Sequence, residues 1–299
     1  MSKDRLTLSA RAKINLALDV LGKRPDGYHE VAMIMQSVAL ADTVALATAD
    51  GISVTVTGAD LDCGPTNLAY RAAVLLRERC GCDRGVSITL AKNIPLAAGL
   101  AGGSADAAAV LRGLNFLWRL GLTPSDLEEF GAVLGSDVPF CLRGGTALAT
   151  GRGELLEALP ALPHAWVVLA KPPLDVSTAW VYGNYRGERV TAHPDIAGMT
   201  ASLKDGKMTG VASRLANVLE TVTVTAHPEI AALKAAMLEH GALASLMSGS
   251  GPTVFGLTED RRQAEKIAAA LRSSAAGWVT VTETAGELGG EDGPTAATD

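Results

Sequence analysis

The sequence is poor in aromatic residues and has no long uninterrupted apolar run. Aromatic side chains make up only 4% of the 299 residues although 48% are hydrophobic, so the core must consist mostly of Ala, Val, Leu and Ile. A chain this apolar is not disordered throughout, and its length suits one large or two ordinary domains. No apolar run reaches the ~18 residues that a membrane span needs, and the N-terminus lacks the apolar core of a signal peptide. We therefore expect no membrane partner.

Basic residues and cysteines are also scarce. The 26 Lys and Arg are outnumbered by 32 Asp and Glu, which gives a formal net charge of −6. This balance, without a basic run, predicts no nucleic acid partner but leaves room for a local phosphate site. The spacing of the cysteines fits neither a paired zinc site nor a disulfide framework, so we expect reduced thiols, no metal site and a cytoplasmic location. They are Cys63, Cys80, Cys82 and Cys141.

Strand and helix patterns are mixed in both halves of the chain, which predicts a two-domain α+β fold. Apolar residues alternate over 12–20, so we expect a strand on which Lys13 and Asn15 share one face. We place the N-terminal domain at residues 1–158, the C-terminal domain at 159–286 and a disordered, Gly-rich tail at 287–299. Further strands are expected at 37–48, 52–58, 85–95, 166–172 and 278–285, and as a pair around a glycine loop within 242–257. Helices are expected at 67–79, 104–121, 124–135, 208–219, 228–240 and 259–274.

The glycine-rich run at 95–106, PLAAGLAGGSAD, stands between a predicted strand and a long helix for which Ser104 is the expected N-cap and Gly121 the expected stop. Glycines let backbone N–H groups approach an anion, and a helix N-terminus adds its positive dipole. The run therefore predicts a phosphate cradle. It is neither a Walker A loop nor a GxGxxG fingerprint. A tight strand-to-helix turn is the alternative explanation of its glycines.

Four segments, in order along the chain, resemble the GHMP small-molecule kinases, which include galactokinase, homoserine kinase and mevalonate kinase. The glycine-rich run resembles their ATP-binding motif, and residues 12–30 (AKINLALDVLGKRPDGYHE) resemble the opening of one member of the family. Residues 135–140 (GSDVPF) resemble the catalytic aspartate segment of that member, and residues 247–256 (MSGSGPTVFG) the C-terminal glycine motif of the family. The resemblance implies a ribosomal-S5-like N-terminal domain, a ferredoxin-like C-terminal domain and an active site in the cleft between them.

The resemblance also implies an activity, the ATP-dependent phosphorylation of an alcohol with Mg²⁺ held mainly by the nucleotide phosphates. Through the stretch KRPDGYHE at 23–30, the resemblance further implies a cytidine diphosphate-linked methylerythritol as the expected substrate, phosphorylated at its 2-hydroxyl in the non-mevalonate route to isoprenoid precursors. The alternatives are a mevalonate- or homoserine-type kinase and a non-catalytic nucleotide sensor of the same fold. We expect a small-molecule substrate and a monomer or weak homodimer.

The resemblance assigns the chemistry to Lys13 and Asp137. The Asp137 carboxylate would take the hydroxyl proton and aim the oxygen at the γ-phosphorus. Lys13, which the resemblance places beside it, would keep that carboxylate ionised and counter the charge on the attacking oxygen. Without the motif, an Asp after Gly-Ser is more often a helix cap or turn former, and a lone Lys on a strand is usually solvated.

The remaining expected contacts form a nucleotide set and a substrate set. In the substrate set, Asn15 holds the alcohol, Tyr28 stacks on the cytosine, His29 meets its polar edge and Tyr182 closes the other side of the base. Gly249 and Gly251 approach the diphosphate or the erythritol end through backbone N–H groups. The nucleotide set implied by the motif is Pro95, Leu96, Ala97, Ala98, Gly99, Leu100, Ala101, Gly102, Gly103, Ser104 and Ala105.

Two positions depart from the glycine motif, since the related kinases often have glycine where Ala101 stands and serine where Ala105 stands. A methyl group at 101 fits the loop provided that this residue keeps a negative φ. The missing hydroxyl at 105 removes one contact to a phosphate or metal. Asp106 can hold Mg²⁺ or stabilise a helix N-terminus, and we favour the helix role. The histidines without ligand spacing are assigned no role; they are His164, His193, His227 and His240.

Overall fold

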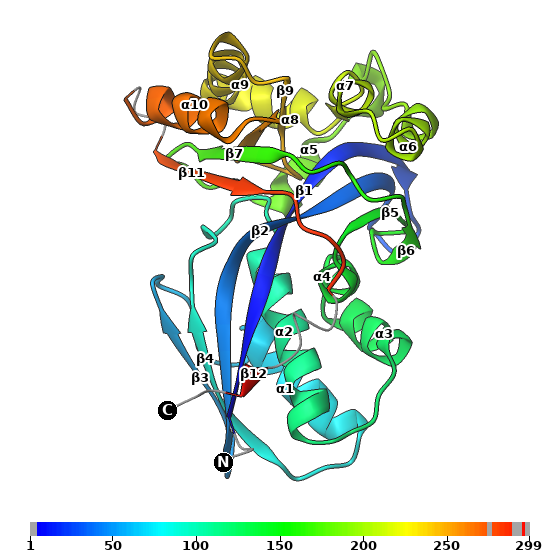
Figure 1. Ribbon diagram of the computed structural model, residues 1–299. Coiled ribbons are helices and arrows are strands. Elements are labelled where there is room, and N and C mark those ends of the chain that lie inside the picture. Colours follow the sequence, from blue (N-terminus) through cyan, green and yellow to red (C-terminus); the bar gives the residue numbers. More distant parts are fainter. Residues whose placement is uncertain (1–4, 274–276, 289–294, 297–299) are drawn as a thin grey trace.

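Two sheets with their helices make up the fold, as the computed structural model shows for residues 5–273, 277–288 and 295–296 (Figure 1). In the lower part of the view, α1 to α4 gather on one side of a large sheet; in the upper part, α9 and α10 lie over a smaller sheet. Within these residues no helix is both long and apolar enough to cross a bilayer. The two-domain α+β fold expected from the sequence is confirmed.

One long antiparallel hairpin runs through both parts. β1 (Arg5–Lys23) pairs with β2 (His29–Ala49) from Arg5 opposite Ala47 to Lys23 opposite His29. Three register shifts interrupt the ladder, and such bulges let a strand bend and twist. The middle of β1 is buried on both faces, with Leu16 and Ala17 fully enclosed. Lys13 and Asn15 are therefore buried polar residues on a strand that both parts cover.

The larger sheet is built on this hairpin. Its order is β12-β1-β2-β4-β3, while β5 pairs with β2 and β6, and β8 pairs with β1. The helices on its face begin with α1 (Leu68–Arg79), capped by Asn67, and end with α4 (Val138–Arg143). The strands are β3 (Ile52–Thr57), β4 (Gly85–Ala91), β5 (Thr146–Thr150), β6 (Leu155–Ala158), β8 (Ala216–Asn217) and β12 (Thr295–Ala296); the other helices are α2 (Gly102–Leu117) and α3 (Pro124–Leu134).

The smaller sheet has the antiparallel order β11-β7-β10-β9. Its apolar strands pack on one side against α10 (Arg261–Ser273), whose buried residues recur at helical spacing. The strands are β7 (Trp166–Lys171), β9 (Ala244–Met247), β10 (Val254–Thr258) and β11 (Trp278–Glu283). The other helices of this half are α5 (Thr178–Asn184), the 3₁₀ turn η1 (Gly187–Arg189), α6 (Ile196–Lys204), α7 (Met208–Ala212), α8 (Glu220–Ala226) and α9 (Pro228–Glu239).

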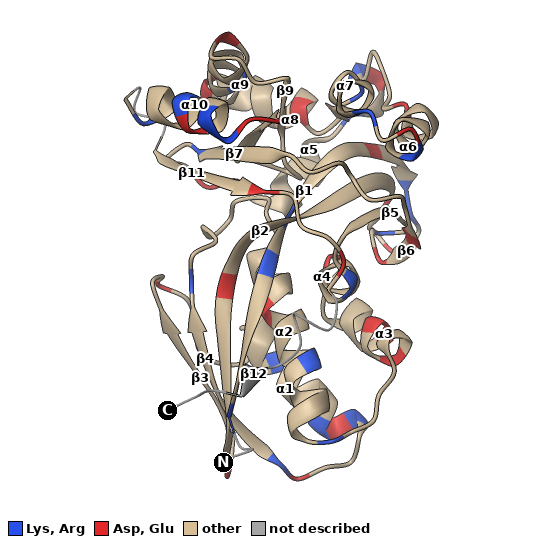
Figure 2. Ribbon diagram, in the orientation of Figure 1, with Lys and Arg blue, Asp and Glu red and all other residues tan. Residues whose placement is uncertain are grey.

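A hydrophobic cluster joins the two parts and fixes the glycine-rich loop. Ile94, Ala98 and Leu100 of that loop are buried in one cluster with Ile14 and Leu16 of β1 and with the β7 and β10 strands. The loop after β4 is therefore held from both sides by side chains that leave water. Charged residues lie mostly outside these cores, and Figure 2 shows residues of both signs on α1 and α10.

Four local predictions differ from the structure. Ser104 is not the N-cap of α2, because Ala101 turns the chain in a left-handed conformation and the helix already begins at Gly102. That helix ends at Leu117 rather than at Gly121, because Arg119 takes the positive φ that ends it. The helix expected over 208–219 stops at Ala212, since Ala216 and Asn217 pair with β1 as β8.

The fourth difference concerns the predicted tail at 287–299. Glu287 forms a bridge with Gly144, and the N–H of Leu288 donates to the carbonyl of Arg143. Residues 295–296 pair with Leu6 and Thr7 as β12 and cover the outer edge of β1. An unpaired strand edge favours such pairing whatever the composition of the added segment. The rest of the predicted tail lies outside the described residues.

Candidate active site

A cavity of about 1240 Å³ opens between the glycine-rich loop, the tip of the β1–β2 hairpin and α5. Lys13 and Asn15, from the middle of β1, line it together with Asp137, and Tyr28 and Tyr182 line it as well. Ser104 lines the cavity too, and its hydroxyl lies close to Gly135, which immediately precedes the Asp137 segment. The motifs that are far apart in the sequence thus meet around one space.

The glycine-rich loop presents the N-terminus of α2 to this cavity. Gly102 and Gly103 are the first two residues of the helix and line the cavity, so N–H groups that have no partner within the helix face it. An N-terminus of this kind attracts phosphate through its open N–H groups and its dipole. This geometry is compatible with the predicted phosphate cradle, and the N-cap of the helix stands three residues earlier than the predicted Ser104.

Ala101 does not have the negative φ that we expected for it. Its φ is +60°, in the left-handed region, where the Cβ of an L-residue is crowded and glycine is favoured. Ala101 precedes the first helical residue, so this conformation sets the direction in which α2 begins. The methyl group is accommodated at the cost of backbone strain, and the expectation of a negative φ is wrong.

Lys13 is the centre of the polar cluster in the cavity. Its ammonium donates to Asn15 Oδ1 at 2.7 Å and to the Gly99 carbonyl at 3.0 Å, and it lies 3.9 Å from Asp137 Oδ2. The side chain is only 5% exposed, so its charge acts in a poorly solvated place. Two of its three N–H donors are fixed by neutral oxygens, which leaves the positive charge directed at the carboxylate.

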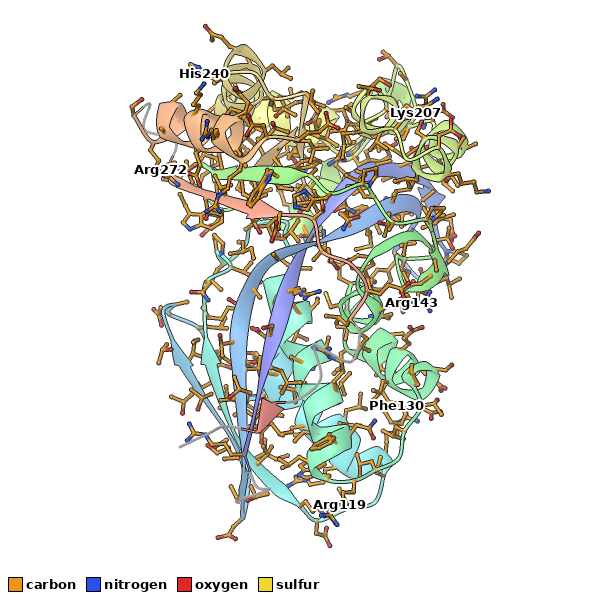
Figure 3. All side chains as sticks on the ribbon, viewed as in Figure 1. Arg119, Phe130, Arg143, Lys207, His240 and Arg272 are labelled. Carbon is orange, nitrogen blue, oxygen red and sulfur yellow. The ribbon has the colours of Figure 1, made fainter. Side chains whose placement is uncertain are left out.

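Asp137 stands at the N-terminus of α4, where an Asp after Gly-Ser is most simply explained as a helix cap. Its side chain makes no capping hydrogen bond, and 32% of that side chain is exposed. The carboxylate is therefore free to meet a ligand beside Lys13. α4 itself is fastened to α3 by the ion pair between Arg143 and Glu128 at 2.8 Å; Figure 3 labels Arg143 at the outer side of this helix.

The second glycine motif forms the loop between β9 and β10. The Gly99 carbonyl accepts a hydrogen bond from Ser248 Oγ at 3.0 Å, in addition to the one from Lys13. A Cβ on Gly249 would come within 3.3 Å of Lys13 Nζ, so this residue lies directly against the polar cluster around Lys13. Asn217 of β8 holds the loop by donating to the carbonyls of Met247 and Gly249. The two glycine loops thus meet at Gly99 and enclose Lys13.

Aromatic residues gather at the hairpin tip and α5. The ring centroids of His29 and Tyr182 are 5.2 Å apart, and Tyr185 lies edge-on to His29 at 6.3 Å. Arg152 places its guanidinium 5.1 Å from the centre of the Tyr28 ring, which is 55% exposed. Burial, with the charge of Lys23 adding to it, lowers the pKa of His29, so the ring is neutral at pH 7. A neutral imidazole offers one donor and one acceptor.

Nearly all predicted site residues line this cavity, and two do not. Ala105 is buried inside α2, so its side chain reaches no ligand. Gly251, with a φ of +84°, does not line the cavity, and a Cβ there would meet Met247 and Thr223. The residues that the structure brings to the cavity are Lys13, Asn15, Tyr28, His29, Pro95, Leu96, Ala97, Ala98, Gly99, Leu100, Ala101, Gly102, Gly103, Ser104, Asp137, Tyr182 and Gly249.

Sequence reasoning missed several lining residues. Arg152 stands between Gly151 and Gly153, and a charged residue within a glycine pair is a signal that could have been followed. His193, assigned no role, reaches the cavity and binds Asp19 through Nδ1 at 2.8 Å. Tyr185 had no local signal, because only the fold brings it beside His29.

Comparison with known proteins agrees with this geometry. The profile of the GHMP kinases N terminal domain matches residues 67–145, and that of the GHMP kinases C terminal domain matches residues 199–277. A homoserine kinase from Cytophaga hutchinsonii shares the fold with a TM-score of 0.79 at 22% identity, over 99% of this chain and 98% of that one. The chain therefore belongs to the GHMP kinase family, and it is an ATP-dependent kinase.

More similar relatives define the branch of that family. The 4-diphosphocytidyl-2-C-methyl-D-erythritol kinase of Geobacillus kaustophilus is 52% identical over 90% of this chain and 93% of its own length. The protein of that name from Bacillus cytotoxicus is 53% identical over 88% and 91%. A crystal structure of 4-(cytidine 5'-diphospho)-2C-methyl-D-erythritol kinase superposes with a TM-score of 0.80 at 36% identity, over 94% of this chain and 99% of that one. The resemblance to one member of the GHMP small-molecule kinases, which the sequence suggested, is confirmed.

Proposed function

We propose that this kinase transfers the γ-phosphoryl group of ATP to the 2-hydroxyl of 4-diphosphocytidyl-2-C-methyl-D-erythritol, a step of the non-mevalonate route to isoprenoid precursors. The observation that carries the proposal is that one cavity contains both the Lys13–Asp137 pair and the Tyr28, His29 and Tyr182 rings. A substrate with an alcohol at one end and a pyrimidine at the other matches this arrangement. Mevalonate and homoserine have no base for the aromatic rings to hold.

The proposed chemistry follows from the Lys13 cluster. With the γ-phosphate near the N-terminus of α2, Asp137 accepts the proton of the substrate hydroxyl, and the oxygen attacks the γ-phosphorus in line. Lys13 stabilises the negative charge that develops between the oxygen and the phosphoryl group. Asn15 fixes the Lys13 ammonium by accepting its hydrogen bond at the amide oxygen, while the Asn15 amide nitrogen donates to Met33 Sδ at 3.5 Å. The proton ends on Asp137, and ADP carries the leaving charge.

Magnesium fits this site as a companion of the nucleotide. No group of three or more metal-binding side chains occurs among the residues that the structure describes, so the ion would be held mainly by phosphate oxygens and water. Ser104 and Asp137 are the side-chain oxygens at this end of the cavity that would hold it. When bound, Mg²⁺ supplies positive charge that neutralises the phosphates.

A competition of substrates tests the proposal. ADP release is measured with 4-diphosphocytidyl-2-C-methyl-D-erythritol, 2-C-methylerythritol 4-phosphate, mevalonate and homoserine at equal concentrations. We expect turnover of the first compound at a kcat/KM at least a hundredfold above the others, about 2.7 kcal/mol of discrimination. Equal phosphorylation of the compound without cytidine would contradict a role for the aromatic rings. Tight ATP binding without turnover of any of the four would favour the nucleotide sensor.

Three further expectations belong to this proposal. A cytoplasmic location rests on the cysteines, which are all free in the structure. The domain boundary between residues 158 and 159 falls between the two matched family domains. A monomer or weak homodimer is expected, and size-exclusion chromatography with light scattering tests it.

A further inference from the structure

A histidine and a buried aspartate form a pair beside the cavity, and the proposed chemistry does not use them. His193 lines the cavity, and its Nδ1 lies 2.8 Å from Asp19 Oδ1 and 3.0 Å from Asp19 Oδ2. The Asp19 side chain is only 8% exposed, whereas 56% of the His193 side chain is exposed. A carboxylate is rarely buried without a reason, and here its partner is a ring that remains open to a ligand.

Both members of the pair are held in place by the fold. Asp19 lies on β1, where its Oδ1 also accepts the N–H of Val20 at 2.8 Å; it makes no ion pair with Lys or Arg in the part of the chain that the structure describes. His193 shortly precedes α6, a helix that begins after its N-cap Asp195, buries Met199 in the central hydrophobic cluster and lies beside the hairpin (Figure 1). The ring is therefore fixed both through its backbone and through Nδ1.

Asp19 determines which ring nitrogen is available to a ligand. A carboxylate accepts hydrogen bonds, so the Nδ1 of His193 carries the proton in the neutral imidazole. Nε2 has no hydrogen-bond partner among the described residues; it accepts in the neutral ring and donates in the protonated ring. A hydroxyl pairs with Nε2 in either state, whereas a phosphate oxygen only accepts and the amino group of cytosine only donates.

The position of the pair along β1 indicates the nucleoside end of the proposed substrate. From Lys13 to Asp19 the strand rises by at most about 20 Å, at about 3.3 Å per residue. Val20 lines the cavity at this level, and the Tyr185 hydroxyl donates to its carbonyl at 3.4 Å, while the Tyr185 ring lies edge-on to His29. The pair therefore lies at the aromatic end of the cavity, where the ribose and its base are expected.

We propose that His193, oriented by Asp19, binds a ribose hydroxyl of the cytidylated substrate through Nε2, with Asp19 as the positioning residue. This inference rests on the proposed function, because it takes the cytidine to lie among Tyr28, His29 and Tyr182. The pair adds a contact to the sugar, so the enzyme prefers a ribonucleoside to a deoxyribonucleoside. A site that hydrogen-bonds a hydroxyl discriminates against the analogue that lacks it, since the polar group of the site is then left unpaired.

Substrates that lack one ribose hydroxyl test the contact. Values of kcat and KM are measured at saturating ATP with 4-diphosphocytidyl-2-C-methyl-D-erythritol and with its 2'-deoxy and 3'-deoxy forms. We expect the wild type to lose about five- to tenfold in kcat/KM with one of these analogues, the usual effect of a single hydrogen bond. The loss should fall on KM, because the ribose is remote from the reacting hydroxyl, and the KM for ATP should stay the same.

Two variants and a matched control assign the effect to the pair. His193→Ala should raise the KM of the complete substrate by the same factor and remove its advantage over the deoxy analogue, with kcat unchanged. Asp19→Asn should raise this KM as well, and it should add little in the His193→Ala background because the two act as one unit. The control is His164→Ala: His164 pairs with Glu283 at 2.9 Å, its side chain is 57% exposed, and it lies outside the cavity lining. It should behave as the wild type.

The outcomes separate this inference from the proposed function. Equal use of the three cytidine compounds by the wild type, or a preference for ribose that persists in His193→Ala, overturns the inference and leaves the kinase assignment intact. A loss of kcat in His193→Ala with an unchanged KM shows a structural role and also overturns it. Failure of the folded, ATP-binding wild type to turn over the complete substrate overturns both. Should Asp19→Asn fail to fold, His193→Ala still decides, because it changes an exposed side chain.

Discussion

Removing the charge of Lys13 should slow phosphoryl transfer far more than it weakens binding. Lys13 Nζ lies 3.9 Å from Asp137 Oδ2 in a nearly enclosed place. At an effective dielectric constant of about 20, two unit charges at this distance interact by about 4 kcal/mol. The charge that forms on the attacking oxygen develops in the same place. We therefore expect Lys13→Met to lower kcat by about 10³-fold, since each 1.36 kcal/mol is tenfold in rate.

Asp137→Asn is the companion variant, because it keeps the shape and cannot take the proton. General-base assistance contributes about 10²–10⁴-fold, so kcat should fall by that order. Lys13 and Asp137 act on the same oxygen, so the double variant should lose much less than the product of the two single losses. Single-turnover phosphorylation at saturating ATP and substrate measures the chemical step, and calorimetry with ATP checks binding.

A dissociative transition state offers a competing expectation. If the proton leaves late, the base contributes little, and Asp137→Asn costs only a few-fold while Lys13→Met remains severe. An Asp137→Asn enzyme that keeps more than about a tenth of the wild-type kcat, below the usual contribution of a general base, would refute the role of Asp137 as base. It would then be a residue that orients the alcohol. Circular dichroism of each variant controls for folding, since Lys13 also holds the Gly99 carbonyl.

Three other expected outcomes follow from the structure. Ala101→Gly should raise the free energy of unfolding in urea by about 1 kcal/mol because it relieves the left-handed alanine, whereas Ala107→Gly, within α2, should lower it by a similar amount. A loss of stability in Ala101→Gly would contradict the positive φ. Tyr28→Ala should weaken substrate binding by roughly 1–3 kcal/mol, the usual value of base–aromatic stacking, with ATP affinity unchanged in calorimetry. Burial raises the pKa of Asp106 to about 7, which means that the folded state holds a proton that the unfolded state releases between about pH 4 and 7, so stability should fall as the pH rises through this window, by up to about 4 kcal/mol. Urea titrations at pH 5 and 8 should measure about 2.7 kcal/mol of this loss, since about two pH units of the window lie between them, and a loss of the same size in Asp106→Asn would refute it.

Local patterns predicted several of the elements on which the proposed site is built. The alternation over residues 12–20 placed Lys13 and Asn15 on one face of a strand, and the structure joins their side chains by a hydrogen bond. Thr123 and Pro124 predicted the start of α3, where Thr123 and Asp126 form a capping box. In both cases the interactions that determine the local structure join residues close together in the chain, so the local sequence is enough to predict it.

Other features depend on contacts that no local pattern contains. Ala216 and Asn217 read as part of a helix, yet the edge of β1 provides backbone partners for them. Ala101 takes a positive φ because the buried residues on either side, Leu100 and Ala105, fix the path of the chain. A propensity argument could not foresee either result, because tertiary packing outweighs an intrinsic preference of about 1 kcal/mol.

The location of Lys13, the proposed catalytic lysine, gives a reason for glycine in two distant loops. The Lys13 charge acts strongly on Asp137 only in a poorly solvated environment, but a buried ammonium requires oxygen partners. The Gly99 carbonyl supplies one of them, and Ser248 Oγ binds the same carbonyl from the other loop. A Cβ on Gly99 would lie 2.3 Å from the Ser248 carbonyl, and one on Gly249 only 3.3 Å from Lys13 Nζ. Gly99 is therefore required by the close approach of the Ser248 backbone, and Gly249 is favoured by its φ of +58° and by its tight approach to the Gly99 carbonyl and Lys13.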